Sequence, residues 1–355
     1  MSLPLPTSLS PSKVASFKDC GLAFRFNAID RLPEAPSPHA AKGTLVHRAL
    51  ELLMWEQPAG RRRLPAALAC LDRARSDVRH DPEYQRLDLG DETEDEWLAD
   101  SAQLVRNYFE LEDPNEVRLV GTELRLSVEV GSLTMRGIID RLELDDDGGL
   151  VVTDYKTGRA PSTSYEQPRL GGVHFYAFLC ERVLGRRPAR IQLLHLREPI
   201  AISTVPSEQS IRGLEQRASA IWAAVEQACE REDFRPNPGR LCQRCAYQAY
   251  CPTFGGDPGL AAEAAAAARA APSAAGLAAV PGRRAVSAPP ADGDTVRATT
   301  ASAPPADAET VSTTTQSTPP AGAETIGVLS ESLAPGAATV APRRTPTLAA
   351  PSGVR

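Results

Sequence analysis

The sequence predicts an α/β fold in which a central mixed β-sheet is flanked by helices. Residues 117–156 alternate apolar and polar side chains in runs rich in Val, Ile and Thr, and Gly or Asp separates the runs. This pattern is typical of antiparallel strands joined by tight turns. Helical patterns precede these strands, and a helix, a strand and a further helix follow them. The order favours an α/β sandwich with a mixed sheet.

The N-terminal part of the folded region is predicted to be helical. A first helix begins after Ser10 or Ser12, either of which can accept the N-cap hydrogen bond. A Pro-rich link follows, and apolar residues at helical spacing predict a second helix over residues 40–56. Residues 61–113 also have mostly helical patterns, and we interpret them as a helical insertion.

The turn residues place the strands and helices that follow. The "DDDGG" stretch at 145–149 stands between two strand patterns and predicts a hairpin, so the next strand returns antiparallel beside the one before it. The predicted elements are strands over 117–130, 133–144 and 150–156, a helix over 173–185, a strand over 190–198 and an amphipathic helix over 211–233.

The folded domain is expected to occupy residues 1–252. Beyond it aromatic residues nearly vanish and Ala, Pro, Thr and Ser dominate, so we predict that 253–355 is a disordered tail with too little apolar surface to fold. Only 261–271 is rich enough in Ala to form one helix. A 15-residue repeat in this tail begins at Ser287, Ser302 and Ser317.

The composition excludes several classes of protein. The net charge is −6, so the chain lacks an overall basic surface for nucleic acid. No apolar run could span a membrane and no signal-peptide core is present, so we expect a cytoplasmic protein. Seven cysteines are then not expected to form disulfides. Because no GxxxxGK[ST] loop occurs, a helicase subunit is excluded.

Asp140, Asp154 and Lys156 form a pattern that suits metal-dependent chemistry. Asp154 and Lys156 are two residues apart on a predicted strand, so their side chains share one face. The predicted hairpin brings Asp140 close to Asp154. Two such carboxylates repel unless a cation lies between them, and Mg²⁺ or Mn²⁺ prefers these oxygens. Water bound to such a cation can attack phosphorus, and Lys156 can stabilise the developing charge.

His47 adds a nitrogen ligand to this set. On the predicted helix, Glu51 shares its face and Gly43 lies one turn earlier, where another backbone or a ligand could approach closely. Imidazole beside two carboxylates suits Mn²⁺ better than Mg²⁺. Each feature alone has an ordinary alternative, because His47 could be a packed core residue and Asp154–Lys156 an exposed ion pair.

Three cysteines near the end of the folded region are spaced as metal ligands. Cys242, Cys245 and Cys251 have C-x2-C-x5-C spacing between Pro- and Gly-containing segments, and Cys20 is the candidate fourth ligand. Four thiolates suit either Zn²⁺ or a [4Fe–4S] cluster, and the spacing does not decide between them. The other cysteines, which lie in helical patterns and are expected to be buried small hydrophobes, are Cys70, Cys180 and Cys229.

Together, these motifs resemble the RecB-family nuclease domain of the PD-(D/E)xK superfamily, in its stand-alone actinobacterial-type form with an iron–sulfur cluster. The resemblance covers nearly all of 8–254 and rests on "GTLVHRALE", "GIIDRLE", "VTDYKTGRAP", "HFYAFL" and "RLCQRCAYQAYCP", in this order. It implies a restriction-endonuclease-like core. The implied metal-dependent active site consists of His47, Asp140, Asp154 and Lys156. The implied ligands of a [4Fe–4S] cluster are Cys20, Cys242, Cys245 and Cys251.

The sequence departs from the family pattern at one position. Members often have Gln four residues before the motif Tyr, but here Gly172 precedes Tyr176 at that distance. Gln167 is nearby but does not occupy the same helical position. Gln167 and Tyr176 are candidates for contact with DNA, although Tyr176 could equally pack in the core.

The resemblance implies that this protein is a divalent-metal-dependent DNA exonuclease that acts in repair or recombination, on single strands or ends. The alternative is a catalytically weak, DNA-binding or regulatory iron–sulfur module with the same fold. The missing Gln and the acidic folded region favour the alternative. The complete set of His47, Asp140, Asp154 and Lys156 favours the nuclease.

Overall fold

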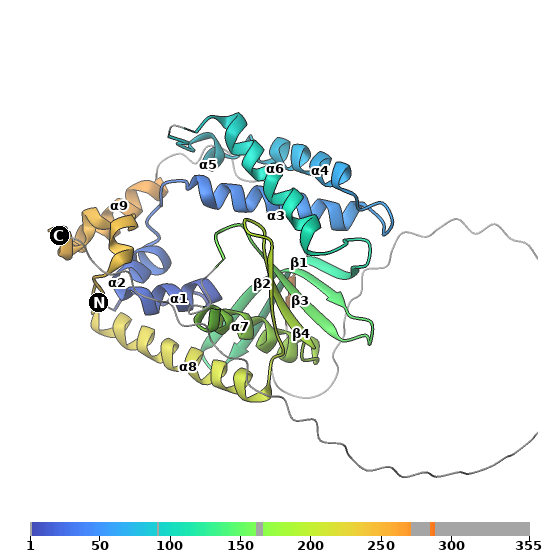
Figure 1. The fold of residues 1–355 in the computed structure, drawn as a ribbon. Coiled ribbons are helices and arrows are strands. Elements are labelled where there is room, and N and C mark those ends of the chain that lie inside the picture. The colour runs from blue at the N-terminus through green and yellow to red at the C-terminus, as the bar shows by residue number, and fades with distance from the viewer. Residues whose placement is uncertain (1, 91, 161–165, 271–284, 288–355) are drawn as a thin grey trace, which may run out of the picture. The chain divides into compact units, whose positions relative to one another are not determined.

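A computed structural model describes residues 2–90, 92–160, 166–270 and 285–287 (Figure 1). Its centre is a mixed sheet of five strands, β1 to β5, and the short strand β6 pairs with β1 at one edge. The strand order is β5-β4-β3-β2-β1-β6. The strands are β1 (Arg118–Val130), β2 (Leu133–Leu144), β3 (Leu150–Lys156), β4 (Arg190–His195), β5 (Ile200–Thr204) and β6 (Ala285–Ser287). The predicted α/β fold with a mixed sheet is confirmed.

The strand pairing follows the turns that the sequence predicts. β1, β2 and β3 form an antiparallel meander, in which Gly131 and Gly148 adopt positive φ in the two turns. β3 and β4 are parallel, because a helix connects them across one face of the sheet. β5 pairs antiparallel with β4, and β6 pairs parallel with β1. The sequence pattern does not predict β5.

Helices cover both faces of the sheet (Figure 1). The α-helices are α1 (Pro11–Asp19), α2 (Gly21–Phe24), α3 (Pro38–Glu56), α4 (Leu64–Val78), α5 (Pro82–Gln85), α6 (Glu94–Leu111), α7 (Glu166–Leu184), α8 (Glu208–Arg231) and α9 (Gly259–Ala270). The shorter elements are the π-helix η1 (Arg25–Asp30) and the 3₁₀ turns η3 (Arg240–Arg244), η4 (Gln248–Tyr250) and η5 (Pro252–Phe254). Of the helices described, none is both long and apolar enough to cross a membrane.

Ser10 is the residue that caps α1, where the sequence left Ser10 and Ser12 as alternatives. Its side chain accepts a hydrogen bond from the backbone N–H of Lys13 at 3.3 Å. The start of α1 is also tied to the sheet, because the backbone N–H of Leu9 donates to the carbonyl of Thr134 at 2.8 Å. The first helix is therefore fixed against β2.

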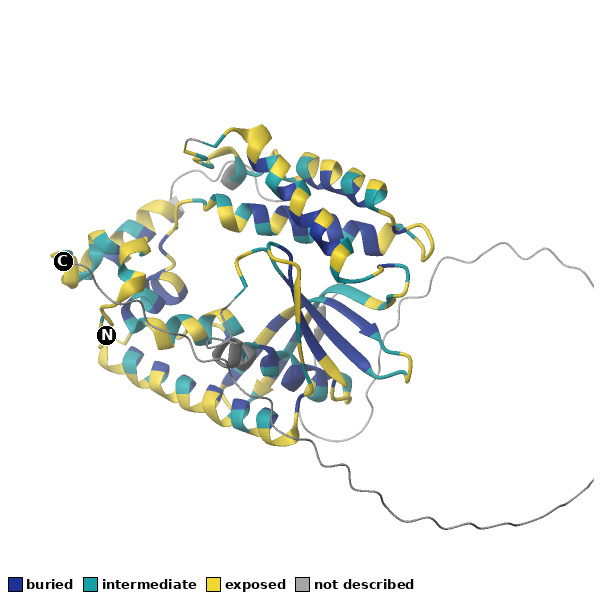
Figure 2. Cartoon of the chain, in the orientation of Figure 1, coloured by how far each residue is buried: buried dark blue, intermediate teal, exposed yellow. Residues whose placement is uncertain are grey.

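Two apolar cores lie on opposite sides of the sheet. The first joins the strands to α2, α7 and α8 through residues such as Leu126, Phe178 and Trp222. The second joins β3 and β4 to α3, α4 and α6, with Trp97 and Tyr155 among its members. In Figure 2 the central strands are mostly buried, whereas the outer sides of α4 and α8 are exposed. The predicted insertion over 61–113 thus supplies α4 and α6, which cover one face together with α3.

The packed chain continues beyond the expected boundary at residue 252. The Ala-rich stretch forms α9, and two of its residues, Ala261 and Ala265, are fully buried in the first core. Small side chains let this helix lie close to η1, whereas its one large apolar residue, Leu260, is exposed. Apart from β6, the rest of the expected tail, with its repeats, lies outside the described residues.

Candidate active site and cysteine cluster

The β2–β3 hairpin brings two of the predicted site residues together. The ladder pairs Arg141 with Thr153, and its next step places Asp140 opposite Asp154. Asp154 is only 4% exposed, and the ammonium of Lys156 forms an ion pair with its Oδ2. The prediction that Asp140 and Asp154 converge across the hairpin therefore agrees with the geometry.

His47 approaches this pair from α3. Its Nδ1 lies 3.5 Å from Oδ2 of Asp140. Glu123, on β1, joins them, and one ligand atom from each of these three residues lies within 4.8 Å of the others. Among the residues described, this is the group of His, Cys, Asp and Glu side chains that could hold one metal ion. We refer to His47, Glu123, Asp140, Asp154 and Lys156 as the carboxylate site.

Glu123 was missed by the sequence analysis. The ladder pairs on either side of it place Glu123 opposite Asp140 on the neighbouring strand. Its φ is +47°, a left-handed conformation that non-glycine residues rarely adopt within a strand. The β1–β2 register shifts nearby, between Leu119 and Gly121. Such irregularities redirect side chains near functional sites, and the amino-acid pattern gives no signal for this one.

Burial and charge shift the pKa values at the carboxylate site in a consistent way. Burial raises the pKa of Asp154, and the charge of Asp140 adds to this, while Lys156 opposes it. Burial lowers the pKa of His47, but the hydrogen bond of Asp140 and the charges of Asp140, Asp154 and Glu123 together outweigh burial and raise it overall. The site therefore has an excess of negative charge, which a divalent cation would neutralise.

Tyr155 supports two members of this site from behind. Its backbone N–H donates to Oδ2 of Asp140 at 2.8 Å, and its ring lies edge-on to the imidazole of His47, with centroids 5.8 Å apart. Its hydroxyl accepts a hydrogen bond from Arg141 at 3.0 Å. Arg141 is fully buried, and its other partners are Tyr108, Glu112, Glu143 and Thr153. Tyr155 itself is a buried member of the second core.

Tyr176 also lies against the carboxylate site. Burial raises its pKa, and the nearby carboxylates of Asp154 and Asp140 raise it further. Tyr176 packs over Gly137, where an added Cβ would lie 3.2 Å from its ring and 2.7 Å from Leu179. Its side chain therefore supports Asp154 in this structure.

The other two positions singled out around Tyr176 lie on the same helix. Gly172 is within α7, and an added Cβ there would have no atom within 4 Å. Gln167 lies in the first turn of α7, but its side chain is outside the part of the chain that the structure describes. Its suggested contact with DNA stays a prediction.

Gly43 permits the close approach that the sequence suggested, and its neighbour is Thr157. An added Cβ at Gly43 would lie 3.1 Å from the Thr157 hydroxyl, directly after the end of β3. Glu51, on the same helix, forms an ion pair with Arg48 at 2.8 Å. Gly43 thus helps to seat α3, and with it His47, against the strand that carries Asp154 and Lys156.

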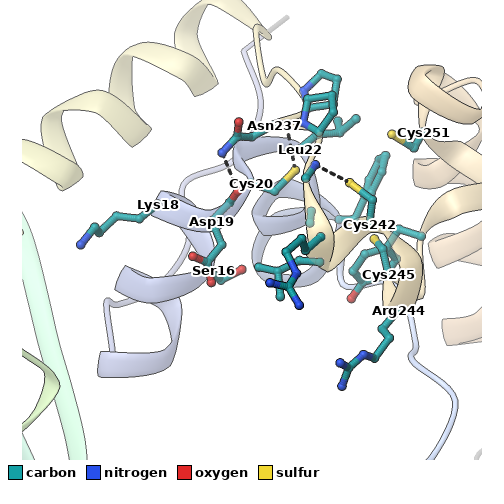
Figure 3. A pocket seen from close by; sticks show the side chains of 18 of the residues that line it. Ser16, Lys18, Asp19, Cys20, Leu22, Asn237, Cys242, Arg244, Cys245 and Cys251 are labelled. Carbon is teal, nitrogen blue, oxygen red and sulfur yellow. Dashed lines mark hydrogen bonds between the residues drawn. The ribbon is translucent and has the colours of Figure 1, made fainter. Parts of the chain in front are cut away.

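The four candidate cysteine ligands gather around one cavity of about 650 Å³ (Figure 3). Cys20 begins α2, while Cys242, Cys245 and Cys251 lie in and between the 3₁₀ turns. All four are partly buried. We refer to these four residues as the cysteine cluster. The remaining cysteines are buried, as predicted: Cys70, Cys180 and Cys229.

Backbone N–H groups point at two of these sulfurs. Asn237 donates to Sγ of Cys20 at 3.5 Å, and Gly239 donates to Sγ of Cys242 at 3.3 Å (Figure 3). Burial raises the pKa of Cys245, and the neighbouring cysteines raise it further. No three sulfurs of the cluster lie within 4.8 Å of one another in the described chain. Ligands of one tetrahedral Zn²⁺, at about 2.3 Å each, would lie closer together.

Comparison with known proteins gives one strong match. No curated protein matches the sequence. Among solved structures, a candidate exonuclease from Eubacterium rectale is 9% identical with a TM-score of 0.44, over 68% of this chain and 88% of that one. The protein SSO0001 is 13% identical with a TM-score of 0.29, over 60% and 85% respectively. These two similarities are too low to bear on function.

The strong match is to a protein family. The family model described as the PD-(D/E)XK nuclease superfamily matches residues 8–252. This range contains the five strands of the main sheet and every residue of the carboxylate site. The chain therefore belongs to the PD-(D/E)XK nuclease superfamily.

Proposed function

We propose that this protein is a divalent-metal-dependent DNA exonuclease of the RecB type, which hydrolyses phosphodiester bonds during DNA repair or recombination. The observation that carries the proposal is the meeting of His47, Glu123 and Asp140 within 4.8 Å, beside the Asp154–Lys156 pair. Family membership supports the class of reaction. The substrate and the biological process are parts of the proposal.

The donor set of the carboxylate site fits a Mg²⁺ or Mn²⁺ ion. Carboxylates of Asp140, Asp154 and Glu123 are hard oxygen donors, and one imidazole, that of His47, favours Mn²⁺. Burial, and then the charge of Asp140, raise the pKa of Asp154, and the positive charge of an ion would favour its ionised form. Such an ion supplies Lewis-acid stabilisation of the phosphate and lowers the pKa of water.

The residues around it have distinct roles in this proposal. The Lys156 side chain is 44% exposed, whereas that of Asp154 is 6% exposed, so the ammonium can reach both the buried carboxylate and a phosphate in solvent. Its positive charge stabilises the charge that develops on the phosphate oxygens. Tyr176 and Tyr155 hold the carboxylates of Asp154 and Asp140 in place.

For the cysteine cluster, we propose a [4Fe–4S] cluster, with Zn²⁺ as the alternative. Four thiol side chains line one cavity of about 650 Å³. Each sulfur of a cubane ligates a different iron, so its ligands need not converge as closely as those of zinc. The spread of the sulfurs supports this choice.

The nuclease proposal is tested with Asp154→Asn and Lys156→Ala. We expect each to reduce Mn²⁺-dependent degradation of linear DNA at least about a hundredfold, measured with 5′- and 3′-labelled strands. Asp147→Asn is the matched control, because Asp147 is an exposed acid in the β2–β3 turn. Full activity in both site variants would overturn the proposal. Wild-type protein that binds DNA but never degrades it would favour the regulatory module instead.

A further inference from the structure

Three cationic side chains gather beside β2, outside the carboxylate site. They come from different elements: Lys13 from α1, Arg31 from the end of η1, and Arg136 from β2. We refer to them as the cationic cluster. Arg31 adopts a left-handed conformation with φ of 58°, which ends the π-helix and is rare for a non-glycine residue.

Hydrogen bonds tie two members of the cationic cluster, Lys13 and Arg136, to the segment before α1. The carbonyl of Leu9 accepts from the N–H of Arg136 at 2.8 Å, which adds the segment before α1 to the free side of β2. The ammonium of Lys13 donates to the carbonyl of Ser8 at 3.0 Å. The positions of Lys13 and Arg136 are therefore set by the same piece of chain.

The electrostatics of this cluster are unfavourable in the protein alone. Burial lowers the pKa of Lys13, and Arg136 and then Arg31 lower it further. The two charged groups that shift the pKa of Lys13, Arg136 and Arg31, are thus both cations. Like charges gathered around a half-buried ammonium reduce stability unless an anion lies among them. Arg31 and Arg136 are exposed, so such an anion could enter from solvent.

The cationic cluster lies in line with the carboxylate site. Arg136, Ile138 and Asp140 alternate on β2 with buried neighbours, so all three project from one side of the strand. Four residues of extended strand span about 13 Å. A strand of B-form DNA has one phosphate per about 3.4 Å of axis, so three or four nucleotides cover this distance.

We propose that Lys13, Arg31 and Arg136 bind a backbone phosphate of the DNA strand whose scissile bond lies at the carboxylate site. The inference rests on the proposed function, because it takes that substrate as the source of the phosphate. It adds a binding site a few nucleotides from the reacting bond, which positions the strand without reading its sequence.

The test is the salt dependence of DNA binding. A labelled single-stranded oligonucleotide is titrated in EDTA with the full chain, and fluorescence anisotropy gives the Kd at several salt concentrations. The variants are Arg136→Gln and Lys13→Gln. Arg212→Gln is the matched control, because Arg212 is a 67% exposed arginine on α8.

We expect each variant of the cationic cluster to bind about threefold to fivefold more weakly at moderate salt, with a salt slope smaller by about 0.7. Arg212→Gln should leave both unchanged. Arg136→Lys should restore the slope, because it keeps the charge. Arg136 is exposed, so its substitution does not threaten folding, and circular dichroism verifies this. Wild-type slopes in both Arg136→Gln and Lys13→Gln would overturn the inference.

Two further arms identify the ligand and separate this inference from the proposed function. Inorganic phosphate should compete with the oligonucleotide only weakly; if it binds the cationic cluster as tightly as DNA does, the DNA assignment is wrong. If the wild-type protein degrades DNA but the variants of the cationic cluster keep the wild-type salt slope, the nuclease proposal stands and the present inference is wrong. If the Arg136→Gln and Lys13→Gln variants have reduced salt slopes but the wild-type protein never cleaves DNA, the phosphate-binding site stands and the nuclease proposal is wrong.

Discussion

The carboxylate site and the cysteine cluster are built in opposite ways. Asp140 and Asp154 lie on neighbouring strands in the middle of the sheet, and buried Tyr155 holds both Asp140 and His47. The cysteines come from a helix start and from 3₁₀ turns that lie far apart in the sequence. They border an open cavity and are only partly buried.

This difference indicates how each site depends on its ligand. Strand hydrogen bonds and core packing hold the residues of the carboxylate site, so the ion proposed there would serve chemistry rather than folding. Cys20, Cys245 and Cys251 already pack against the first core, and Tyr247 contacts Phe26. A bound metal would add to these contacts between the N-terminal helices and the 240–254 segment and would contribute to folding stability. The first three predictions below test this contrast.

The largest effect is expected from Cys251→Ser. Losing one ligand should release the metal and lower the Tm by about 5–10 °C, which corresponds to roughly 2–3 kcal/mol in a domain of this size. Iron and zinc analysis, visible absorbance and thermal unfolding measure it. Cys70→Ala is the control, since Cys70 is buried in the second core and should leave the metal content unchanged. A variant that keeps its metal and its Tm would contradict the structural role.

A second effect is expected at Tyr155, which contacts His47 and Asp140 but no substrate. Tyr155→Leu should weaken Mn²⁺ binding about tenfold, because residues that orient metal ligands typically contribute this much. Tyr155→Phe should keep most of the affinity, since the ring and the backbone N–H remain. Tyr108→Leu is the matched control, because Tyr108 packs in the same core and also contacts Arg141. Equal losses of affinity in Tyr155→Leu and Tyr108→Leu, by titration calorimetry, would mean that packing alone matters.

A smaller effect concerns the stability of the metal-free protein. Because the pKa of Asp154 is raised by burial, its ionised form lowers stability above the usual aspartate pKa of about 4. Asp154→Asn should therefore raise the Tm in EDTA at pH 8, by less as the pH falls, and not at all near pH 4. Melting curves across this range measure it. A lower Tm at pH 8 would show that the Lys156 ion pair outweighs the cost of burial.

The smallest effect compares two helical glycines. Gly172→Ala should stabilise the protein by up to about 1 kcal/mol, since alanine favours the helix and an added Cβ meets nothing within 4 Å. Gly43→Ala should gain less, because its Cβ would lie 3.1 Å from the Thr157 hydroxyl. Urea unfolding gives both values. Equal gains would mean that Thr157 can move aside freely.

The parts of the fold that sequence predicted depend on local patterns. The "DDDGG" turn and alternating strands specified the β2–β3 hairpin, and this hairpin brings Asp140 opposite Asp154. Ser10 was one of two possible caps because both serines are close to the helix start. β5 was missed, since its short run follows a Pro-containing turn and most of its residues are exposed.

The parts that could not be predicted depend on tertiary structure. Glu123 itself adopts a left-handed conformation within β1, and this conformation sets its position. Glutamate has no preference for this conformation, so the sequence does not reveal it. The sequence does not distinguish DNA contact from core packing for Tyr176, because only its packing over Gly137 shows which way its ring faces. The helix α9 was foreseen from its alanines, but its burial depends on the surface that it meets.

Buried Arg141 helps to fix the register in which β2, β3 and β4 pair. Arg141, Thr153 and Gln192 lie directly opposite one another on three adjacent strands, and the side chain of Gln192 donates to Thr153 at 2.7 Å. A slip of one residue would turn this buried polar row to the wrong face and leave the guanidinium unpaired, at a cost of about 3–5 kcal/mol. The same slip would separate Asp140 from Asp154, one position along the strands. A side chain outside the site thus selects the alignment in which the site can exist.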